Sequence, residues 1–591
     1  MLSQPLLSGL CFLALLIGVP SNTPVADSAM EGNYVQLRSL LKEGVKVNAA
    51  QGDGMTALHW AAFRDDLEMI KLLLAAHANV HAATRDGAIT PLLLACTNGD
   101  PQAVEALLKA GANPNSVNAN GTTALMLAAA AGNGDTVRVL LDHGAEVNAL
   151  EIRHGQTALM FAAALNRAAV IKLLIAHGAD AGITTKSRPG EDVQVDEIGH
   201  VFYERSQDKG ADEAAQAVAR ANAEAKSDLD MFSRALGFKS AEFAVAKPRQ
   251  RPPQTGIRKG ADFVGGMTAL LFAARDGHVQ AVRALLDAGV DVNQANADKL
   301  TPLLLAIING HLDLAQYLLD RGADPNSTTL SGLTALYATL DLQWAPHASF
   351  PQPSTDQESV SYIDLMKALI AREANVNAQL GKKSWFRSYF SDSSWVDPSG
   401  ATPFWRAAQS NDIAAMHLLI EHGADPKIAT KSGVTPLMVA SGIGWSANWT
   451  VNAPVPPIEA VKYCVELGND VTAVMPTGHT ALHGAAYIGN NEIVTYLVSK
   501  GAKVDARTKA GNSPADMANG PNRFAQPHPE TVVLLEKLGS PNSHNCRSDQ
   551  CVVMAAIPKV SSQAVQAERD GLDKLATAVG LRSAVYLAES R

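Results

Sequence analysis

The side chains best suited to acid–base or metal chemistry in this chain are its 16 histidines and 5 cysteines. His59, in the stretch TALHWAA from Thr56 to Ala62, is the first to consider, because an imidazole can act as a general base or bind a metal ion. No histidine stands at a metal-ligand spacing from a carboxylate or a cysteine, and the chain contains no H-E-x-x-H, G-x-S-x-G, G-x-x-x-x-G-K-[ST] or C-x-x-C-H motif. The sequence therefore predicts no catalytic, cofactor-binding or metal-binding residues.

A short motif, threonine followed by Ala or Pro and then by Leu or Phe, recurs along the chain. Seven of its ten intervals are 33 or 34 residues, and the remaining three are 111, 68 and 45 residues, which indicates repeats that carry insertions. A period of this size is typical of a solenoid built from stacked units. The motif begins at Thr56, Thr90, Thr123, Thr157, Thr268, Thr301, Thr334, Thr402, Thr435 and Thr480, with the variant SPA at Ser513.

Each unit also carries a second motif, such as LLKAGANPN from Leu107 or LLDRGADPN from Leu318. Its glycine follows a helical stretch and is the residue that most readily adopts the left-handed conformation that ends a helix. Between the two motifs, residues 56–80 indicate a short helix, a polar turn and a second, amphipathic helix. The joining pattern N-A-x-x-x-G-x-T predicts a β-turn whose threonine caps the next helix.

The repeats supply a comparison for His59. Because a chemically active group would not be interchangeable with leucine or methionine, we expect this position to be a semi-buried contact between repeats that contributes packing and one hydrogen bond. Trp60, which aligns with leucines and phenylalanines, is predicted to be framework in the same way. At the position of His59 the other units carry Leu93, Met126, Met160, Leu271, Leu304, Tyr337, Trp405 and Met438, and only His483 repeats the histidine.

Taken together, T-[AP]-L-H-x-A-A, a G-H turn or its equivalent, and L-L-x-x-G-A-D-V-N at a 33-residue period resemble the ankyrin repeat family. The resemblance extends from Thr23 to Ser540 apart from the insertions. It implies an all-α solenoid of about twelve helix–turn–helix units, with β-turn fingers along one edge and a concave surface that binds other macromolecules.

The long intervals divide the chain into segments. The first block of repeats precedes a long insertion that holds one expected helix and a linker rich in proline and arginine, and the second block carries shorter insertions. The expected boundaries are residues 1–21 for a signal peptide, 22–186 and 266–542 for repeats, 187–265 for the long insertion, 342–362, 380–400 and 442–458 for the shorter ones, and 543–591 for a C-terminal tail.

The insertions have distinctive compositions. In the long one, Ala225, Leu229, Phe232 and Leu236 follow a helical spacing, and the basic stretch KPRQRPPQTGIRKG after them is a solvated linker or, less simply, a polyanion site. The shorter insertions are rich in aromatic residues, which either pack on the solenoid or bind a partner. These are Trp385, Phe386, Tyr389, Phe390 and Trp395 in one insertion and Trp445 and Trp449 in the next.

The first residues of the chain indicate export. Leu6 to Val19 form an uninterrupted run of apolar and small residues, followed by a polar stretch, which predicts a signal peptide cleaved after Ser21 or Ala26. The run is shorter than the roughly 20 residues that a membrane-spanning helix needs. We therefore expect a periplasmic or secreted protein with no membrane span after cleavage.

The cysteines fit an exported chain without requiring disulfides. Cys96 and Cys464 fall at apolar helix positions, where a buried thiol is expected. Cys546 and Cys551 are close enough in sequence to form a disulfide in an oxidising compartment, although the sequence does not decide whether they do. Their C-x4-C spacing without a following histidine lacks the haem attachment motif, which argues against a redox module in the tail.

The resemblance also suggests where a partner binds. In the ankyrin family the variable positions are the finger tips and the two residues after the A-A pair, which here are Asp53, Met55, Phe63, Arg64, Arg85, Asp86, Arg153, Arg275, Asp276, Gln409, Lys431 and Tyr487. The aromatic finger from Trp385 to Trp395 is expected on the same edge. Since interface energy concentrates in a few aromatic and arginine side chains, the predicted partner-binding residues are Phe63, Arg64, Arg85, Arg153, Arg275, Trp385 and Tyr487.

From these patterns we expect a monomeric, non-catalytic scaffold without a cofactor, which binds a protein whose identity the sequence does not reveal. The net charge of −9 gives no reason to expect nucleic acid binding. Two alternatives stay open. One is a periplasmic enzyme or electron-transfer accessory protein with its chemistry in the insertions or the tail, and the other is a structural component of the cell envelope.

Overall fold

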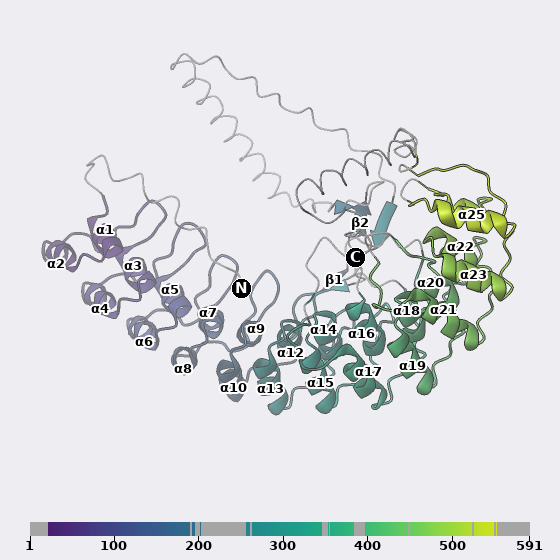
Figure 1. Ribbon diagram of the computed structural model, residues 1–591. Coiled ribbons are helices and arrows are strands. Elements are labelled where there is room, and N and C mark those ends of the chain that lie inside the picture. The colour runs from purple at the N-terminus through teal and green to yellow at the C-terminus, as the bar shows by residue number, and fades with distance from the viewer. Residues whose placement is uncertain are drawn as a thin grey trace, which may run out of the picture. The chain divides into compact units, whose positions relative to one another are not determined.

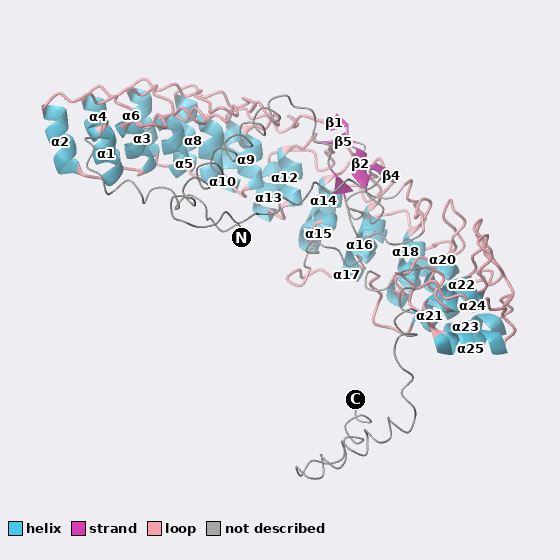
Figure 2. Cartoon of the chain, turned by 90° about the horizontal axis from the view of Figure 1, so that it is seen from above, coloured by secondary structure: helices cyan, strands magenta, loops and turns pink. Residues whose placement is uncertain are grey.

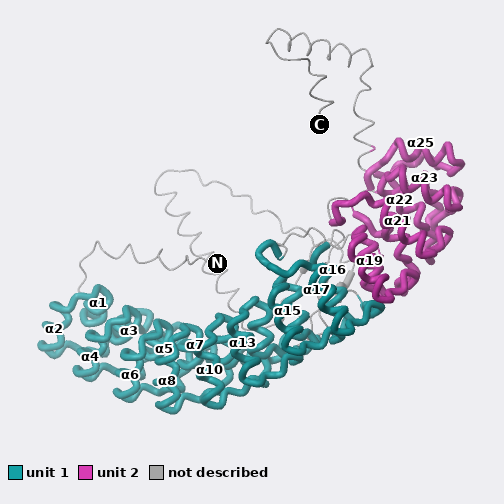
Figure 3. Tube along the Cα trace, turned by 60° about the horizontal axis from the view of Figure 1, so that its bottom comes forward, with its two compact units in different colours: residues 1–392 teal, residues 393–591 magenta. Residues whose placement is uncertain are grey.

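The computed structural model describes residues 22–189, 192–195, 201–202, 256–259, 263–344, 353, 355–382, 396–446, 450–522, 525–548 and 551. The chain forms two compact units, residues 1–392 and residues 393–591 (Figure 3). The expected signal peptide, residues 1–21, lies outside the described residues. In the part of the chain that the structure describes, no helix is long and apolar enough to cross a membrane.

In residues 1–392 the described helices form eight consecutive pairs (Figure 1). We call the two members of each pair the first helix and the second helix. The pairs are α1 (Pro24–Glu31) and α2 (Tyr34–Lys42), α3 (Ala57–Phe63) and α4 (Leu67–Ala75), α5 (Pro91–Asn98) and α6 (Pro101–Lys109), α7 (Ala124–Ala131) and α8 (Gly134–Asp142), α9 (Ala158–Ala164) and α10 (Ala168–Ala176), α12 (Ala269–Arg275) and α13 (Val279–Asp287), α14 (Pro302–Ile308) and α15 (Leu312–Asp320), and α16 (Ala335–Gln343) and α17 (Tyr362–Ile370).

Residues 393–591 hold four further pairs among the described residues. They are α18 (Pro403–Gln409) and α19 (Ile413–Glu421), α20 (Pro436–Ala440) and α21 (Pro457–Glu466), α22 (Ala481–Tyr487) and α23 (Asn491–Ser499), and α24 (Pro514–Ala518) and α25 (Pro529–Lys537). The expected helical solenoid is therefore what both units contain.

The repeated motifs set the ends of these helices, as the sequence predicted. Thr123 begins α7 by accepting a hydrogen bond from the N–H of Met126 through its Oγ1 at 3.2 Å, and the threonine before most first helices acts in the same way. After the second helices, glycines such as Gly111 and Gly144 adopt φ of 96° and 88°, the left-handed conformation that stops a helix. After two of the second helices, α4 and α17, His77 and Glu373 take this conformation instead of a glycine.

Packing between neighbouring pairs forms the core. Within each compact unit, the first helix of one pair packs against the first helix of the next, as α3 does against α1 and α5. These helices are rich in alanine, so their backbones approach closely, and five of the seven residues of α3 are buried. Second helices bury only one stripe, which in α4 consists of Met69, Ile70 and Leu73. The core is thus a continuous seam between pairs.

The loops that join successive pairs extend from one edge of the helices as fingers, which Figure 2 shows in pink along the row from α1 to α10. Neighbouring fingers are joined by backbone hydrogen bonds. The N–H of Arg85 donates to the carbonyl oxygen of Asp53 at 2.8 Å, and the N–H of Ile152 donates to that of Asn120 at 3.1 Å. Each finger is therefore held in place by the one before it.

In the same loops, shortly after the second helix ends, the asparagine of the second motif bridges to the next pair. The Asn148 side chain accepts from the N–H of Asp180 at 2.9 Å and donates to the carbonyl oxygen of Gly178 at 3.0 Å. Asn48, Asn115, Asn293 and Asn326 make the same two bonds in their own units. A side-chain amide suits this place because it donates and accepts at once.

The long insertion leaves the array from a finger and returns to it. Thr185 donates its N–H to the carbonyl oxygen of Met267 at 2.9 Å, which brings the two ends of the insertion together. Consequently α9 and α10 pack against α12 and α13 as though no residues intervened. All pairs up to α17 lie in one compact unit.

Short strands, which the all-α expectation did not include, lie at the base of this insertion. β1 (Arg188–Pro189) pairs antiparallel with β5 (Phe263–Val264), and β2 (Asp192–Val195) lies between β3 (Val201–Phe202) and β4 (Gly256–Lys259). The antiparallel strands β1 and β5 continue the finger from which the insertion leaves. The helix predicted around Ala225 to Leu236 lies outside the described residues.

A second insertion separates α16 from α17, as predicted. Its end is fastened to the first turn of α15, because the carboxylate of Asp313 accepts from the N–H groups of Ser359 and Val360 at 2.9 and 2.7 Å. The edge of Trp344 packs on the ring of Tyr362, with centroids 6.0 Å apart. The aromatic residues of the next finger, from Trp385 to Trp395, lie outside the described residues, as does Trp449.

The third insertion changes the first helix that precedes it. α20 has five residues, and the turn that follows it runs against α22 at Gly484. A Cβ at Gly484 would come within 2.7 Å of the backbone nitrogen of Ile443 and 2.9 Å of the carbonyl oxygen of Ser441. Other units carry a tryptophan, leucine or phenylalanine at this position, Trp60 among them. Glycine is present here because the insertion fills the space.

We therefore predict that Gly484→Ala destabilises residues 393–591 by about 1–3 kcal/mol, since the added methyl group meets backbone atoms that have no free space to move into. Alanine would otherwise favour a helix by up to about 1 kcal/mol. Gly134→Ala in α8 is the matched control, because the nearest atom there is 4.0 Å from the added carbon. Urea denaturation should show loss of stability for the first variant and none for the second. Equal effects would contradict this account of the insertion.

Candidate functional site

His59 serves the framework, although more firmly than the sequence suggested. Its side chain is completely buried, whereas we expected a semi-buried one with a single hydrogen bond. Nδ1 accepts from the N–H of Thr56 at 3.1 Å, and Nε2 lies 2.9 Å from the carbonyl oxygen of Ile89 in the next unit. Because a carbonyl oxygen only accepts, Nε2 carries the proton and the ring is neutral. Burial also lowers the pKa of His59.

The same bond between repeats recurs where the side chain can supply it. In His483, Nε2 lies 3.3 Å from the carbonyl oxygen of Asn512, and Trp405 donates its indole N–H to the carbonyl oxygen of Val434 at 3.0 Å. Leucine fills the position by packing, and Met126 adds a contact in which its sulfur accepts from the N–H of Thr123 at 3.4 Å. A ring N–H at this site is therefore an added link between two units, not a catalytic group.

The remaining reactive side chains are also occupied by the framework. Burial raises the pKa of the Cys96 and Cys464 thiols, so both stay protonated. Cys546 and Cys551 pair as a disulfide, with Cα atoms 6.3 Å apart. The structure brings His143 to within 3.0 Å of Glu105, a contact that the sequence could not show. Within the described ranges, no three or more His, Cys, Asp or Glu side chains are grouped as a metal site would require.

The predicted partner-binding residues near the first helices differ in their availability. Phe63 is 58% exposed, and its ring meets Trp60 edge to face with centroids 5.9 Å apart. Arg64 donates to the carbonyl oxygen of Met30 at 3.2 Å, so it ties its unit to the preceding one. Arg275 lies over the ring of Phe272 and donates twice to Asp276, at 2.8 and 2.9 Å, which holds it in a fixed and accessible position.

The other predicted residues divide in a similar way. Arg85 and Arg153 are exposed on fingers, and Arg85 donates to the carbonyl oxygen of Gly52 at 2.9 Å. Tyr487 is half-buried, and burial raises the pKa of its hydroxyl, so it is less accessible than a finger residue. Trp385 lies outside the described residues. Phe63, Arg64, Arg85, Arg153 and Arg275 are thus the exposed members of the set.

Sequence reasoning missed an apolar cluster on two adjacent fingers. Val117, Leu150 and Ile152 are 45, 53 and 66% exposed, and we call them the finger cluster. Ile152 lies against Gly121 of the neighbouring finger, where a Cβ would be 2.8 Å from its backbone nitrogen. The motif drew attention to Arg153 beside it, but apolar residues at finger positions that are otherwise polar were the available signal.

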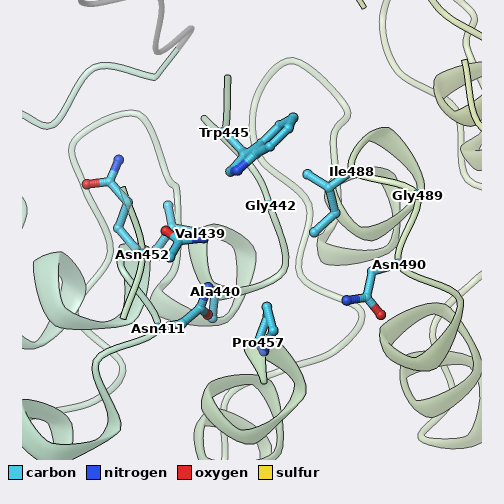
Figure 4. Close-up of a pocket in the computed structure, with 11 residues that line it drawn as sticks. Asn411, Val439, Ala440, Gly442, Trp445, Asn452, Pro457, Ile488, Gly489 and Asn490 are labelled. Carbon is cyan, nitrogen blue, oxygen red and sulfur yellow. The ribbon is translucent and has the colours of Figure 1, made fainter. Parts of the chain in front are cut away.

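The third insertion builds a small pocket in residues 393–591 (Figure 4). The pocket has a volume of about 250 Å³. The ends of three successive first helices form its floor, and the insertion supplies Trp445 and Asn452, so Trp445 neither packs wholly into the core nor stands free. Its lining residues are Gln409, Asn411, Val439, Ala440, Gly442, Trp445, Asn452, Pro457, Ile488, Gly489 and Asn490.

Comparison with known families gives matches along both units. The family model for ankyrin repeats in three copies matches residues 8–86, 26–118, 92–185 and 250–329. The description of a single ankyrin repeat matches residues 399–431 and 477–509. Together these matches cover more than half of the chain and coincide with most of the helix pairs described above.

Similar segments occur in proteins of different kinds. E3 ubiquitin-protein ligase KEG of Arabidopsis thaliana is 35% identical over 130 residues, which are 22% of this chain and 8% of that protein. Human ankyrin repeat and SOCS box protein 3 is 35% identical over 102 residues, 17% of this chain and 20% of that protein. Mouse protein phosphatase 1 regulatory subunit 27 is 30% identical over 103 residues, 17% of this chain and 66% of that protein. The chain thus matches less than two thirds of each of these relatives.

The buried histidines predict a dependence of stability on pH. Burial lowers the pKa of His483 from 6.5 to about 4, and the neighbouring His479 adds to the effect. Between these values the unfolded chain binds a proton that the folded chain does not, so the stability present above pH 6.5 is lost as the pH falls towards 4, by about 3 kcal/mol at most. His483→Leu should make stability fall less steeply between pH 7 and pH 5.

Urea denaturation at the two pH values measures this difference. Leucine is the residue at the equivalent positions Leu93 and Leu304, so the variant keeps the packing. A variant whose stability falls as steeply as that of the unchanged protein would show that His483 is not the group responsible.

Proposed function

Because the chain belongs to the ankyrin repeat family, we propose that it is a non-catalytic scaffold that binds a protein partner through its fingers and the ends of its first helices. Ankyrin repeats commonly serve protein interaction, and the two relatives named for a SOCS box and for a phosphatase regulatory subunit fit such a role. We further propose that the protein acts as a monomer and without a cofactor.

The finger cluster is the observation that carries this proposal. Three apolar side chains on adjacent fingers are exposed to solvent and are not buried in the core. Neighbouring fingers are hydrogen-bonded to each other, so these side chains are held in position before a partner arrives. Preorganised apolar groups lose little conformational entropy on binding and are typical interface anchors. The exposed Arg85 and Arg153 flank the cluster with positive charge.

A second accessible row follows the ends of the first helices in residues 1–392. Met30, Phe63 and Leu165 are 37, 58 and 48% exposed at the ends of three of these units. Fingers and first-helix ends vary between units in sequence while the core does not. Variation on a fixed framework is what a recognition surface requires.

The alternative of an enzyme draws no support from a particular group of side chains. The buried His59 and His483 and the buried Cys96 and Cys464 serve the framework. The name of the Arabidopsis ligase refers to a protein of which the matched segment is 8%. Catalysis by the long insertion or the tail would need residues outside the described ranges.

We also propose that the protein is exported. Support comes from the apolar run between Leu6 and Val19 and from the pairing of Cys546 with Cys551. Val25 and Ala26 are completely buried in α1, which packs against α3, so cleavage after Ser21 preserves the first unit better than cleavage after Ala26. Sequencing the N-terminus of the purified protein tests this, and an intact Met1 would contradict export.

For the function itself, we predict that Ile152→Ala and Leu150→Ala each weaken partner binding by about tenfold or more, since truncating an interface anchor costs about 2 kcal/mol. The melting temperature should not change, because both side chains are exposed. The partner can be found by placing a photoreactive amino acid at position 152 and identifying the crosslinked protein, and affinity is then measured by calorimetry.

Val35→Ala is the matched control. Val35 is the most exposed large apolar residue named here, at 84%, but it lies on the second helix α2, away from the fingers. Its replacement should leave affinity unchanged. If the finger variants bind like the unchanged protein, or if Val35→Ala weakens binding as much, the surface lies elsewhere.

A further inference from the structure

The pocket under the third insertion contains polar atoms that the fold leaves without a partner. Asn411 is 4% exposed, and its Oδ1 accepts no hydrogen bond. Oδ1 of Asn452 is also buried and unpaired. Both residues line the pocket (Figure 4). A buried oxygen without a donor is unfavourable, so two of them facing one pocket indicate a missing group that donates.

Asn166, in residues 1–392, shows which hydrogen bond Asn411 lacks. Asn166 occupies the equivalent turn between a first and a second helix, and both asparagines have positive φ, 56° and 54°. Oδ1 of Asn166 accepts from the N–H of Ala281 at the start of the next second helix, at 3.0 Å. The second helix of the pair after Asn411 is α21, and its third residue, Glu459, is the counterpart of Ala281. The N–H of Glu459 donates instead to the carbonyl oxygen of Pro456 at 3.1 Å, so the donor that Asn166 uses is taken up within α21.

The insertion also brings Asn452 close to Asn411. The N–H of Ala453 donates to the carbonyl oxygen of Ser410 at 2.8 Å. Asn452 and Asn411 are the immediate neighbours of these two bonded residues, so one backbone hydrogen bond holds the backbones of both residues at the same side of the pocket.

The opposite side offers a donor. Oδ1 of Asn490 accepts from the N–H of Ile493 at 3.0 Å and caps α23, so its NH2 group is the part directed toward the pocket (Figure 4). Apolar contact comes from Val439, Trp445 and Ile488. No lining residue is charged, so a charged ligand would lose its hydration without gaining a counter-charge.

We propose that this pocket binds a neutral amide group of a protein partner, most directly the carboxamide of an asparagine or glutamine side chain. The NH2 of a carboxamide supplies N–H donors of the kind that the unpaired oxygens of Asn411 and Asn452 lack. Its carbonyl oxygen accepts from Asn490, and its aliphatic stem lies against Trp445. This inference rests on the proposed function, because it assumes that the occupant belongs to a protein.

The test uses the full chain and small probes, so it does not depend on having the partner. The indole N–H signals of the seven tryptophans are followed by NMR, and Trp445→Phe identifies the signal of Trp445. N-acetylglutamine methylamide is the probe, and N-acetylglutamate methylamide, which has the same shape but is charged, is its control. We expect the glutamine probe to shift the Trp445 signal in a saturable manner and the glutamate probe to leave it in place.

Asn411→Gly is the decisive variant. Gly442 and Gly489 occupy the equivalent turns with positive φ, so glycine preserves the backbone while it removes the amide. The variant should keep its melting temperature and bind the probe roughly threefold to tenfold more weakly, the loss expected for one hydrogen bond. Asn166→Gly is the control, which should lower the melting temperature and leave probe binding unchanged.

Several outcomes would overturn the proposal. If no probe shifts the Trp445 signal, the unpaired oxygens are satisfied by water alone. If the glutamate probe binds as well as the glutamine probe, or if glucose binds better than either, the pocket does not select an amide. If the probe binds but Ile152→Ala has no effect on any partner, the pocket stands and the finger surface fails, which separates this inference from the proposed function.

Discussion

The contact between one helix pair and the next is the interaction on which this structure depends. A pair such as α3 and α4 is too short to bury its own apolar face, and its second helix covers only one stripe. The face is covered because the first helices of neighbouring pairs pack directly on one another. Three sets of hydrogen bonds reinforce this contact, one between fingers, one through asparagines such as Asn148, and one through the rings of His59, His483 and Trp405.

This constraint explains where the insertions occur. A solenoid tolerates extra residues only where they leave the contact between pairs intact, and the long insertion meets this condition by leaving and returning through one finger. The third insertion, in contrast, is accompanied by changes in the residues around it. It follows the five-residue α20, requires glycine at position 484 and lies beside the unpaired side-chain oxygen of Asn411. The most distinctive chemistry of the described residues therefore arises where an insertion disturbs the regular contact.

The periodic motifs were sufficient to predict the helix pairs, the threonine caps and the glycine stops, because these depend on local backbone preferences that repeat with the sequence. The role of His59 was predicted only in part. Its replacement by leucine and methionine elsewhere shows that packing is common to all units, but the bond to Ile89 depends on a partner 30 residues away. Six of the seven predicted partner-binding residues followed the motif, which selects positions and not exposure, so the half-buried Tyr487 was included and the exposed Ile152 was not. The unpaired oxygen of Asn411 had no sequence signal, since Asn166 carries the same residue with its donor present.

The most direct test of the account is whether the array survives removal of its longest insertion. Residues 190–262 are replaced by Asn-Gly, which joins β1 to β5 through a two-residue hairpin turn. If the contact between α9–α10 and α12–α13 is independent of the insertion, the free energy of unfolding of residues 1–392 should stay within about 0.5 kcal/mol of its original value, as for changes at the surface. Separate unfolding of the pairs before and after the junction, or a marked loss of stability, would show that the insertion is part of the core and would contradict the account.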